Sequence, residues 1–485
     1  MLKNMEVIRN YKLWAAMLSV AALVGCVVGP RYQGPPNPAL HDYHAVRAVA
    51  APVPAEAAAV TLDSWWLGFN DPLLTRIVER ALSQNLDLAA ALARVDQARA
   101  AAKEAGAQLL PAGALDTSVN QLHQSLTGPI GAIAHDLPGY QRNQTLYDAS
   151  VGAGWEIDLF GGLRRGAEAA RDEAQAAESE RLALRVSVVA EAADAYFRVR
   201  GDQARLVIAQ SQVNNDAHLL ELIRLRLAKG ASSDKEVAQA EALLAQARAT
   251  IPPLDTALEA QLNRLDVLMG AQPGTYAAEL AQPADIPLTP PIPEDQDASD
   301  LLRRRPDIIA AERRLAASNA RIGVAVAEYY PKVSLAGALG FDSLSAGRLF
   351  SAESFQPQAA AGLRWRLFDF GRVDAEVAQA NGAHAQALLA YRQSVLRAAE
   401  DVENAFTSLA QLEIEIHELG AEVDALRRAR DTSQELYLAG ASSLTDVLDA
   451  ERESLVAQDE LAQARADSDR SAVASFRALG GGWKM

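Results

Sequence analysis

The sequence of 485 residues is poor in the groups that enzymes commonly use, because it contains one cysteine and seven histidines. A single cysteine excludes an intrachain disulfide and a paired-thiol redox site. The sequence has no GxxxxGK phosphate loop, no HExxH zinc motif and no CxxC pair. Beyond the N-terminal segment, no stretch is apolar enough for a transmembrane helix. We therefore predict a protein that is not an enzyme and that uses no metal or cofactor.

The charge balance is acidic, with a formal net charge of −16 and 22% charged residues. Nucleic-acid binding requires clustered lysine and arginine, so this composition disfavours nucleic acid as a partner. An internal duct with this charge would favour cations.

The N-terminus has the layout of a secretory signal, with basic residues at Lys3, Arg9 and Lys12 followed by the apolar stretch 13–24. That stretch is too short to span a membrane. Cys26 follows Leu-Val-Gly directly, which resembles the lipobox of bacterial lipoproteins. We therefore predict a signal peptide over 1–25, lipidation of Cys26, and a proline-rich tether over 26–71.

The rest of the chain is duplicated. KGASS at 229–233 returns as AGASS at 439–443, a shift of 439 − 229 = 210 that also places Trp155 on Trp365. Further upstream the shift is 331 − 111 = 220, from Pro111 to Pro331. The difference predicts a longer connecting loop in the first repeat. The repeats are expected at 72–275 and 276–480, followed by a short tail at 481–485.

Each repeat contains two segments of alternating apolar and polar residues, clearest in 147–159. This period of two predicts strands at about 112–125, 146–159, 332–342 and 358–369. Strands of this length with an outward tryptophan suit a transmembrane barrel, but a soluble sheet covered by helices has the same pattern. Four strands cannot close a water-filled barrel, so a membrane barrel must be shared between chains.

A very long helix follows the strands in each repeat, at 161–229 and 371–439. Apolar residues recur every seventh position from Leu388 to Val423, which is typical of a coiled coil. Return helices are expected at 232–270 and 442–479, the first kinked or broken at Pro252 and Pro253. A structural coiled-coil protein would explain the heptads but not the strands.

Together these features resemble the TolC/OprM family of outer-membrane efflux channels, in its lipoprotein branch. The residues that carry the resemblance run in order along the chain: Tyr32, Trp65-Trp66, Phe69 with Asp71-Pro72-Leu73, Arg304-Arg305-Pro306-Asp307, the segment 327–335, Leu448-Asp449-Ala450 and the segment 478–483. The resemblance implies a mainly α protein with membrane β structure. Three chains would form a twelve-stranded barrel, four strands each, above a twelve-helix periplasmic tunnel. Shorter helices and a belt would come from 72–110 and 276–327, and the strand-connecting loops near 126–144 and 343–356 would be extracellular.

The implied function is a passive exit duct in the bacterial outer membrane, lipid-anchored and extending into the periplasm. It would join a periplasmic adaptor protein and a proton-driven inner-membrane pump, and would export small amphipathic toxicants or drugs. A duct for type I protein secretion is the alternative. A surface-anchored structural coiled-coil lipoprotein is an alternative of another class.

The resemblance also implies functional residues at the ends of the long helices. Asp446 and Asp449 match the family's gate aspartates, and Tyr437 and Glu236 match positions that tie neighbouring helices together. Ser442 stands where the best-known branch has an arginine, which puts one latch bond in doubt. The turns expected to dock the adaptor are formed by Gly230, Ala231, Ser232, Gly440, Ala441 and Ser442.

Overall fold

The computed structural model describes residues 27–35, 61–287, 289–291 and 304–484. Cys26 and the expected signal peptide lie outside the described residues. The described chain forms two compact units, a sheet unit of 27–35, 96–176 and 312–390, and a helical unit of the remainder. No helix in the described ranges has an apolar stretch long enough to cross a membrane.

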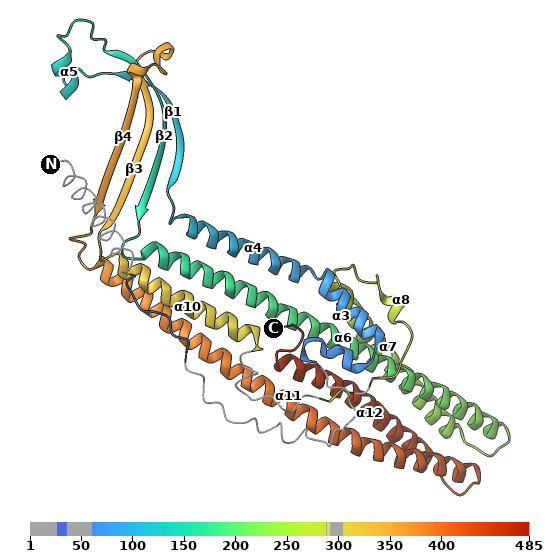
Figure 1. Ribbon diagram of the computed structural model, residues 1–485. Helices are drawn as coiled ribbons and strands as arrows, with labels where there is room; N and C mark the ends of the chain where they lie inside the picture. The colour runs from blue at the N-terminus through green and yellow to red at the C-terminus, as the bar shows by residue number, and fades with distance from the viewer. Residues whose placement is uncertain (1–26, 36–60, 288, 292–303, 485) are drawn as a thin grey trace. The chain divides into compact units, whose positions relative to one another are not determined.

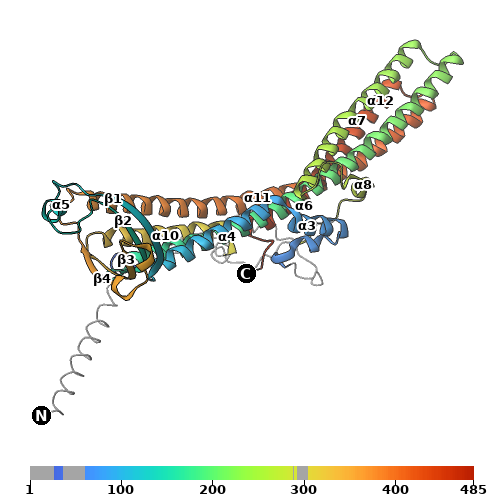
Figure 2. The same ribbon diagram turned by 90° about the horizontal axis from the view of Figure 1, so that it is seen from above.

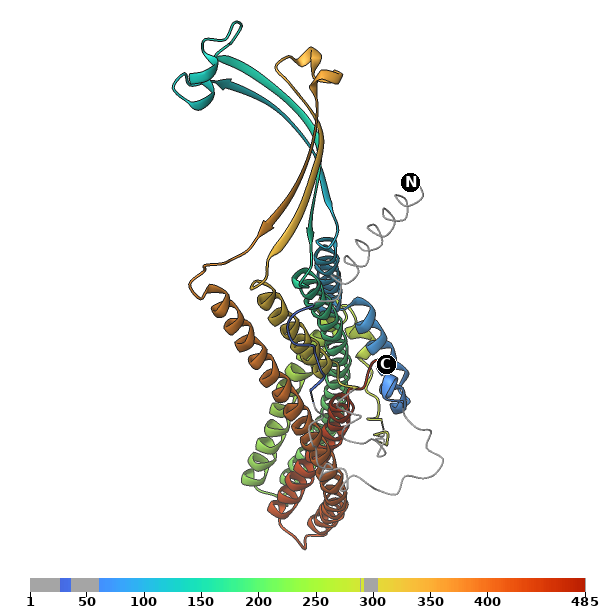
Figure 3. The ribbon, with the colours of Figure 1, turned by 60° about the vertical axis from the view of Figure 1, so that its left-hand side comes forward.

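The sheet unit contains four antiparallel strands in the order β1-β2-β3-β4, drawn side by side in Figures 1 and 3. They are β1 (Ala112–His123), β2 (Asn143–Ile157), β3 (Lys332–Ser343) and β4 (Phe355–Arg364). All four predicted strands are confirmed. The predicted end of the last strand at 369 is wrong, because β4 ends at Arg364, where its pairing with β3 ends. Residues 365–367 pair with no strand among the described residues. The β1–β2 loop, which contains α5 (Pro129–Ala134), is longer than the β3–β4 loop with η2 (Ala346–Arg348) and η3 (Ala352–Ser354), as the two shifts predicted.

The strand pairing repeats with the same two shifts that the sequence shows. Ala112 lies opposite Gly154 in the first repeat, and Lys332 lies opposite Arg364 in the second. The differences are 332 − 112 = 220 and 364 − 154 = 210. The duplication is therefore a duplication of structure, residue by residue.

The two long helices are α6 (Gly162–Ala228) and α11 (Arg372–Leu438), each 67 residues long. The return helices are α7 (Asp234–Leu268) and α12 (Leu444–Ala478). Figures 1 and 2 show each long helix turning into its return helix as a hairpin. The heptad prediction agrees with burial along α11, where the buried seam residues are Val395, Ala398, Val402, Ala405, Leu409 and Val423.

Of the two outcomes expected at Pro252 and Pro253, a kink or a break, the break is wrong, since α7 continues through both prolines as one helix. A proline in a helix removes a backbone donor and costs about 3 kcal/mol. Buried residues on both sides of the prolines, Ala247 and Leu254, fix the helix against its neighbours. Packing of the apolar face therefore overrides the local preference.

The shorter helices are η1 (Leu62–Phe69), α3 (Pro72–Gln84), α4 (Leu86–Ala107), α8 (Ala277–Leu280) and α10 (Pro306–Ala327). Of these, η1 falls within the predicted tether, which is therefore wrong at its C-terminal end. Trp65 of η1 is 1% exposed and stacks on Phe476 with ring centroids 5.2 Å apart. Burying so large an aromatic side chain is enough to fold this end of the segment.

The predicted C-terminal tail is also part of the folded core at its start. The Gly482 N–H donates to the Leu62 carbonyl at 2.7 Å, and Trp483 is buried. Arg304 donates to the Asp63 carboxylate and, at 3.0 Å, to the Trp483 carbonyl. Arg304, the first residue of the Arg-Arg-Pro-Asp motif, therefore binds both η1 and Trp483 near the C-terminus. The sequence alone predicts these two segments as a tether and a tail.

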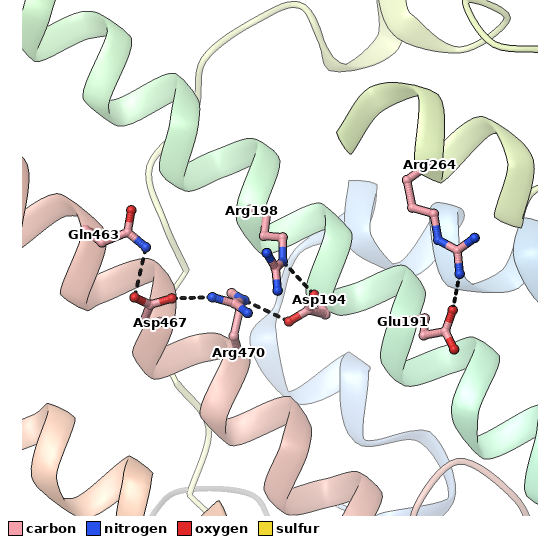
Figure 4. A network of polar contacts seen from close by, with 7 residues as sticks. All are labelled: Glu191, Asp194, Arg198, Arg264, Gln463, Asp467 and Arg470. Atoms are coloured by element: carbon pink, nitrogen blue, oxygen red, sulfur yellow. Dashed lines mark hydrogen bonds and ion pairs between the residues drawn. The ribbon is translucent and has the colours of Figure 1, made fainter. Parts of the chain in front are cut away.

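Ion pairs join α6 and α12 across the helical unit (Figure 4). Arg470 of α12 donates to Asp194 of α6 at 2.7 Å, and Arg198 donates to the same carboxylate at 2.8 Å. Arg470 also pairs with Asp467, which accepts from Gln463 at 2.8 Å. This network fixes the long helix of one repeat to the return helix of the other.

Candidate functional site

The two hairpin turns, which lie in the helical unit, have the same backbone structure. Gly230 has φ +73° and Gly440 has φ +79°, a left-handed conformation that favours glycine. In the first turn the Ala231 N–H donates to the Arg226 carbonyl at 2.8 Å, and in the second the Ala441 N–H donates to the Leu436 carbonyl at 2.9 Å. These bonds close each long helix in a Schellman motif, which explains why glycine occupies both positions.

Each return helix then begins with a reciprocal cap. Ser443 accepts from the Asp446 N–H at 3.3 Å, and the Asp446 carboxylate accepts from the Ser443 N–H at 3.1 Å. The Ser442 hydroxyl adds a bond of 2.6 Å to the same carboxylate. The Ser442 hydroxyl first, and then the Ser443 N–H, lower the pKa of Asp446 below its usual range. Asp446 is therefore charged at the helix N-terminus, where a negative charge is favourable.

The first turn is built in the same way around Glu236. Its carboxylate accepts from the Ser232 hydroxyl at 2.6 Å and from the Ser233 N–H at 3.0 Å, and these groups lower its pKa. Glu236 and Asp446 are repeat equivalents, since 446 − 236 = 210. Two of the four residues that the resemblance assigns to the gate, Glu236 and Asp446, thus also cap their own helices.

Asp449 lies one turn further along α12 and is exposed. Its carboxylate pairs with Arg452 at 3.1 Å, and both side chains remain more than half exposed. Unlike Asp446, it has no bond to the turn among the described residues. The Asp449 carboxylate is therefore accessible to solvent and to ions at this face of α12.

Tyr437 is buried at the end of α11 and contacts an arginine that sequence reasoning missed. The guanidinium carbon of Arg226, on α6, lies 4.6 Å from the centroid of the Tyr437 ring. Arg226 also donates to the Tyr437 carbonyl at 3.2 Å. Among the described residues of this single chain, the Tyr437 hydroxyl has no hydrogen-bond partner. Burial raises the pKa of Tyr437.

Tyr437 belongs to one cluster of buried side chains with apolar residues of α6, α7 and α12, and these are Val213, Leu219, Leu220, Ile223, Ala240, Leu244, Ala247, Leu444 and Val447. The structure therefore brings the ends of the two hairpins together around Tyr437. A sequence signal for Arg226 exists, because its repeat equivalent is Leu436 and that of Tyr437 is Leu227. The two repeats therefore have different residues at the positions where the ends of α6 and α11 contact each other.

Two buried acids lie further along the same helices. Asp216 of α6 is 2% exposed and Glu451 of α12 is 6% exposed. Burial first, and then the charge of Glu451, raise the pKa of Asp216 to about 6. Burial raises the pKa of Glu451 as well. The repeat equivalent of Asp216 is Leu426, so an acid in a heptad seam was the signal available from the sequence.

Among the described residues, no group of three or more histidine, cysteine, aspartate or glutamate side chains is arranged to hold a metal ion. The site is thus a set of helix ends and buried contacts between helices.

A family model described as outer membrane efflux protein matches residues 77–271 and 298–481. The chain belongs to the outer membrane efflux proteins. The family is one of channels rather than enzymes, and this family membership places the protein in the bacterial outer membrane.

Two curated relatives align over nearly the whole chain. The pyoverdine export outer membrane protein OpmQ of Pseudomonas putida is 33% identical over 434 residues, which are 90% of this chain and 91% of that protein. The toluene efflux pump outer membrane protein TtgF of Pseudomonas putida is 30% identical over 491 residues, with 96% of each chain covered.

The solved structure of the outer-membrane channel OprN has the same fold. It superposes with a TM-score of 0.85 at 35% identity and covers 94% of this chain and 100% of the other. These relatives confirm the predicted resemblance and the role of the chain as an efflux duct.

Proposed function

We propose that this outer membrane efflux protein is the passive exit duct of a tripartite pump for small amphipathic compounds. The observation that carries this proposal is the alignment, over nine-tenths or more of both chains, with proteins named for pyoverdine export and toluene efflux. Those names belong to the relatives. They support a small-molecule cargo here more than a protein cargo.

Closure of the duct requires further copies of the chain. A single chain supplies four strands in an open sheet whose outer strands are β1 and β4. Twelve strands from three chains would form a barrel wide enough to hold water. Every residue of β1 and β4 is exposed in the single chain, as expected for strands whose neighbours come from other subunits and from lipid.

The energy for export comes from another protein in this proposal. The sequence has no phosphate-binding loop, so the duct does not itself hydrolyse a nucleotide. We propose a proton-driven inner-membrane pump as the energy source and a periplasmic adaptor as the connector. The adaptor would contact the hairpin turns at 230–232 and 440–442, whose matching geometry presents two similar surfaces per chain.

The gate is proposed at the same end of the helices. Asp446 and Asp449 would form acidic rings in the trimer, and Tyr437 with Glu236 would lie between the hairpins. The contact between Arg226 and Tyr437 supports a closed arrangement, because it joins α6 of one hairpin to α11 of the other. Like charges repel, so the rings cannot themselves hold the helices together.

The membrane anchor is proposed at Cys26. Acyl chains on this cysteine would add about 0.8 kcal/mol of membrane affinity per buried methylene. Mass spectrometry of the mature N-terminus tests this proposal. An unmodified N-terminus at another residue contradicts it.

The function is tested in a strain that lacks its own outer-membrane duct. The chain is expressed there with a proton-driven pump and its adaptor, and the inhibitory concentrations of toluene and of apolar antibiotics are measured. A several-fold rise in both supports small-molecule efflux. Restored secretion of a protein substrate of an ATP-driven exporter, without such a rise, contradicts it.

A further inference from the structure

The interface between α6 and α12 joins one helical hairpin to the other through a series of polar contacts. Arg470 donates to Asp194 at 2.7 Å (Figure 4). Arg205 donates to both oxygens of Asp459, at 2.7 and 2.9 Å. The two contacts are 205 − 194 = 11 residues apart on α6 and 470 − 459 = 11 residues apart on α12. Because eleven residues are about three helical turns, both contacts lie on one face of each helix.

The next contact toward the hairpin turns is built on an amide instead of an arginine. It lies 212 − 205 = 7 residues further along α6 and 459 − 451 = 8 residues back along α12, which is about two turns. Here the Gln212 amide donates to both Asp216 and Glu451. An acid therefore faces an acid at this contact, where an arginine faces an acid at the two contacts before it.

Burial makes a full charge on both acids of this pair costly. Asp216 and Glu451 are both buried. The second carboxylate oxygen of Asp216 is buried and has no hydrogen-bond partner among the described residues. A buried charge that lacks a donor or an ion partner is strongly unfavourable. A proton on Asp216 removes this charge and also removes its repulsion from Glu451.

The charged groups around the pair determine which of the two acids holds the proton. Burial raises the pKa of Glu451, while Arg430 of α11 lowers it and Asp431 raises it. Burial and the charge of Glu451 raise the pKa of Asp216, and the Gln212 amide lowers it. Glu451 thus has an arginine beside it that favours its charged form, whereas Asp216 faces an acid. The side chains of α7 in the adjoining cluster are apolar, and these are Ala240, Leu244 and Ala247.

The repeat equivalents of the two acids have different surroundings. The equivalent of Asp216 is Leu426, which packs against a buried apolar cluster. The equivalent of Glu451 is Glu241, which is exposed and pairs with Arg224 at 2.6 Å. A leucine is the residue that packing alone favours in a heptad seam. Packing therefore does not account for an acid at position 216, whereas a role in joining the hairpins does.

We propose that Asp216 and Glu451 form a proton-dependent contact that holds the ends of the two hairpins together while the pair carries a proton and allows them to separate when both acids are charged. Loss of the proton to water adds one negative charge beside Glu451, and like charges repel. The contacts of Arg205 and Arg470 lie further from the turns and keep α6 and α12 joined there. The inference rests on the proposed duct and adds its regulation by pH.

The direction of the effect follows from the raised pKa of Asp216. This pKa is about 6 when the hairpins are joined, against an ordinary value of 3.8. The proton's contribution to the joined form is fully present below pH 3.8 and is lost as the pH rises through about 6. Over this range the ratio of separated to joined hairpins rises by at most about a hundredfold. The hairpin end of the duct should therefore be more closed at pH 5 than at pH 8.

The first test measures the distance between the hairpins in full-length protein purified in detergent. Spin labels are attached to Glu221→Cys on α6 and Glu453→Cys on α12, which are exposed positions. Pulsed electron paramagnetic resonance should find a longer distance, in a larger share of the protein, at pH 8 than at pH 5. Single-cysteine variants control for distances between copies and for Cys26. Adding Asp216→Asn should make the distances at the two pH values equal.

The second test measures single-channel conductance in planar bilayers. The conductance of the wild type should rise several-fold from pH 5 to pH 8, and Asp216→Asn should keep the low value at both. Glu451→Gln should reduce the rise, because one of the two repelling charges is gone, and it serves as a second variant if Asp216→Asn does not assemble. Glu241→Gln, the exposed repeat equivalent, is the matched control and should retain the full rise.

The two tests together distinguish a failure of this inference from a failure of the proposed function. Equal distances at both pH values in the wild type overturn the inference, as does a pH-dependent separation that persists in Asp216→Asn. If that protein still confers drug resistance, the proposed function stands. A separation at pH 8 that is lost in Asp216→Asn, with no change in conductance, supports the contact and contradicts the proposed gate at this end of the duct.

Discussion

Asp216 of α6 and Glu451 of α12 accept hydrogen bonds from one amide group, that of Gln212. Its Nε2 lies 2.8 Å from an oxygen of Asp216 and 3.4 Å from an oxygen of Glu451. The second oxygen of Asp216 is buried and has no partner among the described residues. Two charged groups of α11 also act on Glu451, and these are Arg430 and Asp431, which pair with each other at 2.7 Å. Ionising both buried acids is therefore unfavourable.

The pH dependence of stability follows from Asp216. Because burial raises its pKa from 3.8 to about 6, the folded state binds this proton more tightly than the unfolded chain. The group's contribution is fully present below pH 3.8 and is lost as the pH rises through about 6. Asp216→Asn should therefore raise the free energy of unfolding at pH 8, by about 1–3 kcal/mol, and change it little at pH 4.

Thermal unfolding in detergent at pH 4 to 8 measures this effect. Glu241→Gln is the matched control, because Glu241 is the exposed equivalent of Glu451 and pairs with the exposed Arg224. The same pH profile in the wild type and in Asp216→Asn would show that the buried pair is not responsible.

The contact between Arg226 and Tyr437 gives a prediction about the gate. Arg226→Met keeps the length of the side chain and removes an interaction of about 0.5–2 kcal/mol with the ring. We expect a higher single-channel conductance in planar bilayers, because α6 and α11 are held less firmly. Tyr437→Phe should change conductance little, since it removes a hydroxyl that has no partner among the described residues.

Arg226→Met and Tyr437→Phe together distinguish whether the arginine or the tyrosine hydroxyl holds the gate closed. A large rise in conductance with Tyr437→Phe and none with Arg226→Met would mean that the hydroxyl bonds to Glu236 in the assembled duct. Arg224→Met, two residues away and exposed, is the control for loss of a positive charge.

The acidic rings are tested at Asp449 rather than at Asp446. Asp449→Asn removes a charge whose side chain is exposed, so it should weaken block of the channel by divalent cations without loosening the turn. Asp446→Ala also removes a helix cap, which typically costs about 1 kcal/mol of helix stability. Its effect on cation block would therefore combine the loss of a charge with a change in the turn. Glu453→Gln, another exposed acid on α12, controls for net charge. Unchanged cation block in Asp449→Asn would place the cation site elsewhere.

The sequence was sufficient for the repeats, the four strands, the two long helices and the two return helices, because each depends on a periodic pattern or on an exact recurrence such as Trp155 and Trp365. The sequence was insufficient where the packing of side chains from distant segments determines the local structure. Pro252 looks like a helix breaker until its buried neighbours are known, and Trp65 looks like part of a tether until Phe476 is found beside it.

The site was predicted less completely for a related reason. Resemblance located Tyr437, Asp446 and the turns, but it gave no sign of Arg226, which faces Tyr437 from a helix 211 positions away in sequence. The duplication does not preserve the contacts between one repeat and the other. Positions where one repeat departs from the other, such as Asp216 against Leu426, are therefore the places to search for functional residues in a duplicated chain.

The adaptor-docking proposal is tested at the second turn. Ala441 is exposed and follows Gly440, so a charged side chain there should leave the Schellman motif and the cap intact. Ala441→Asp should abolish drug resistance while oligomer and membrane levels stay normal. Ala439→Asp, on the other side of the glycine, is the control for a new charge near the turn. Full resistance in Ala441→Asp would rule out this turn as a contact.

The orientation of the strands toward lipid gives the last prediction. Leu363, Trp365 and Leu367 alternate with Arg364 and Arg366, and all three apolar side chains are exposed in the single chain. Leu363→Arg would place a charge against lipid, at a cost of about 2–4 kcal/mol at the middle of the membrane and less toward its edges. Leu363 is one residue from the end of β4, so the smaller part of this range applies. Ala360→Arg is the control on the opposite face, and it is preferable to Gly362→Arg because a side chain at Gly362 would meet the Ser334 hydroxyl at 2.9 Å. We expect Leu363→Arg to lower the amount of heat-modifiable protein in the outer-membrane fraction far more than Ala360→Arg does. Equal loss in the two variants would mean that these strands do not present their odd-numbered face to lipid.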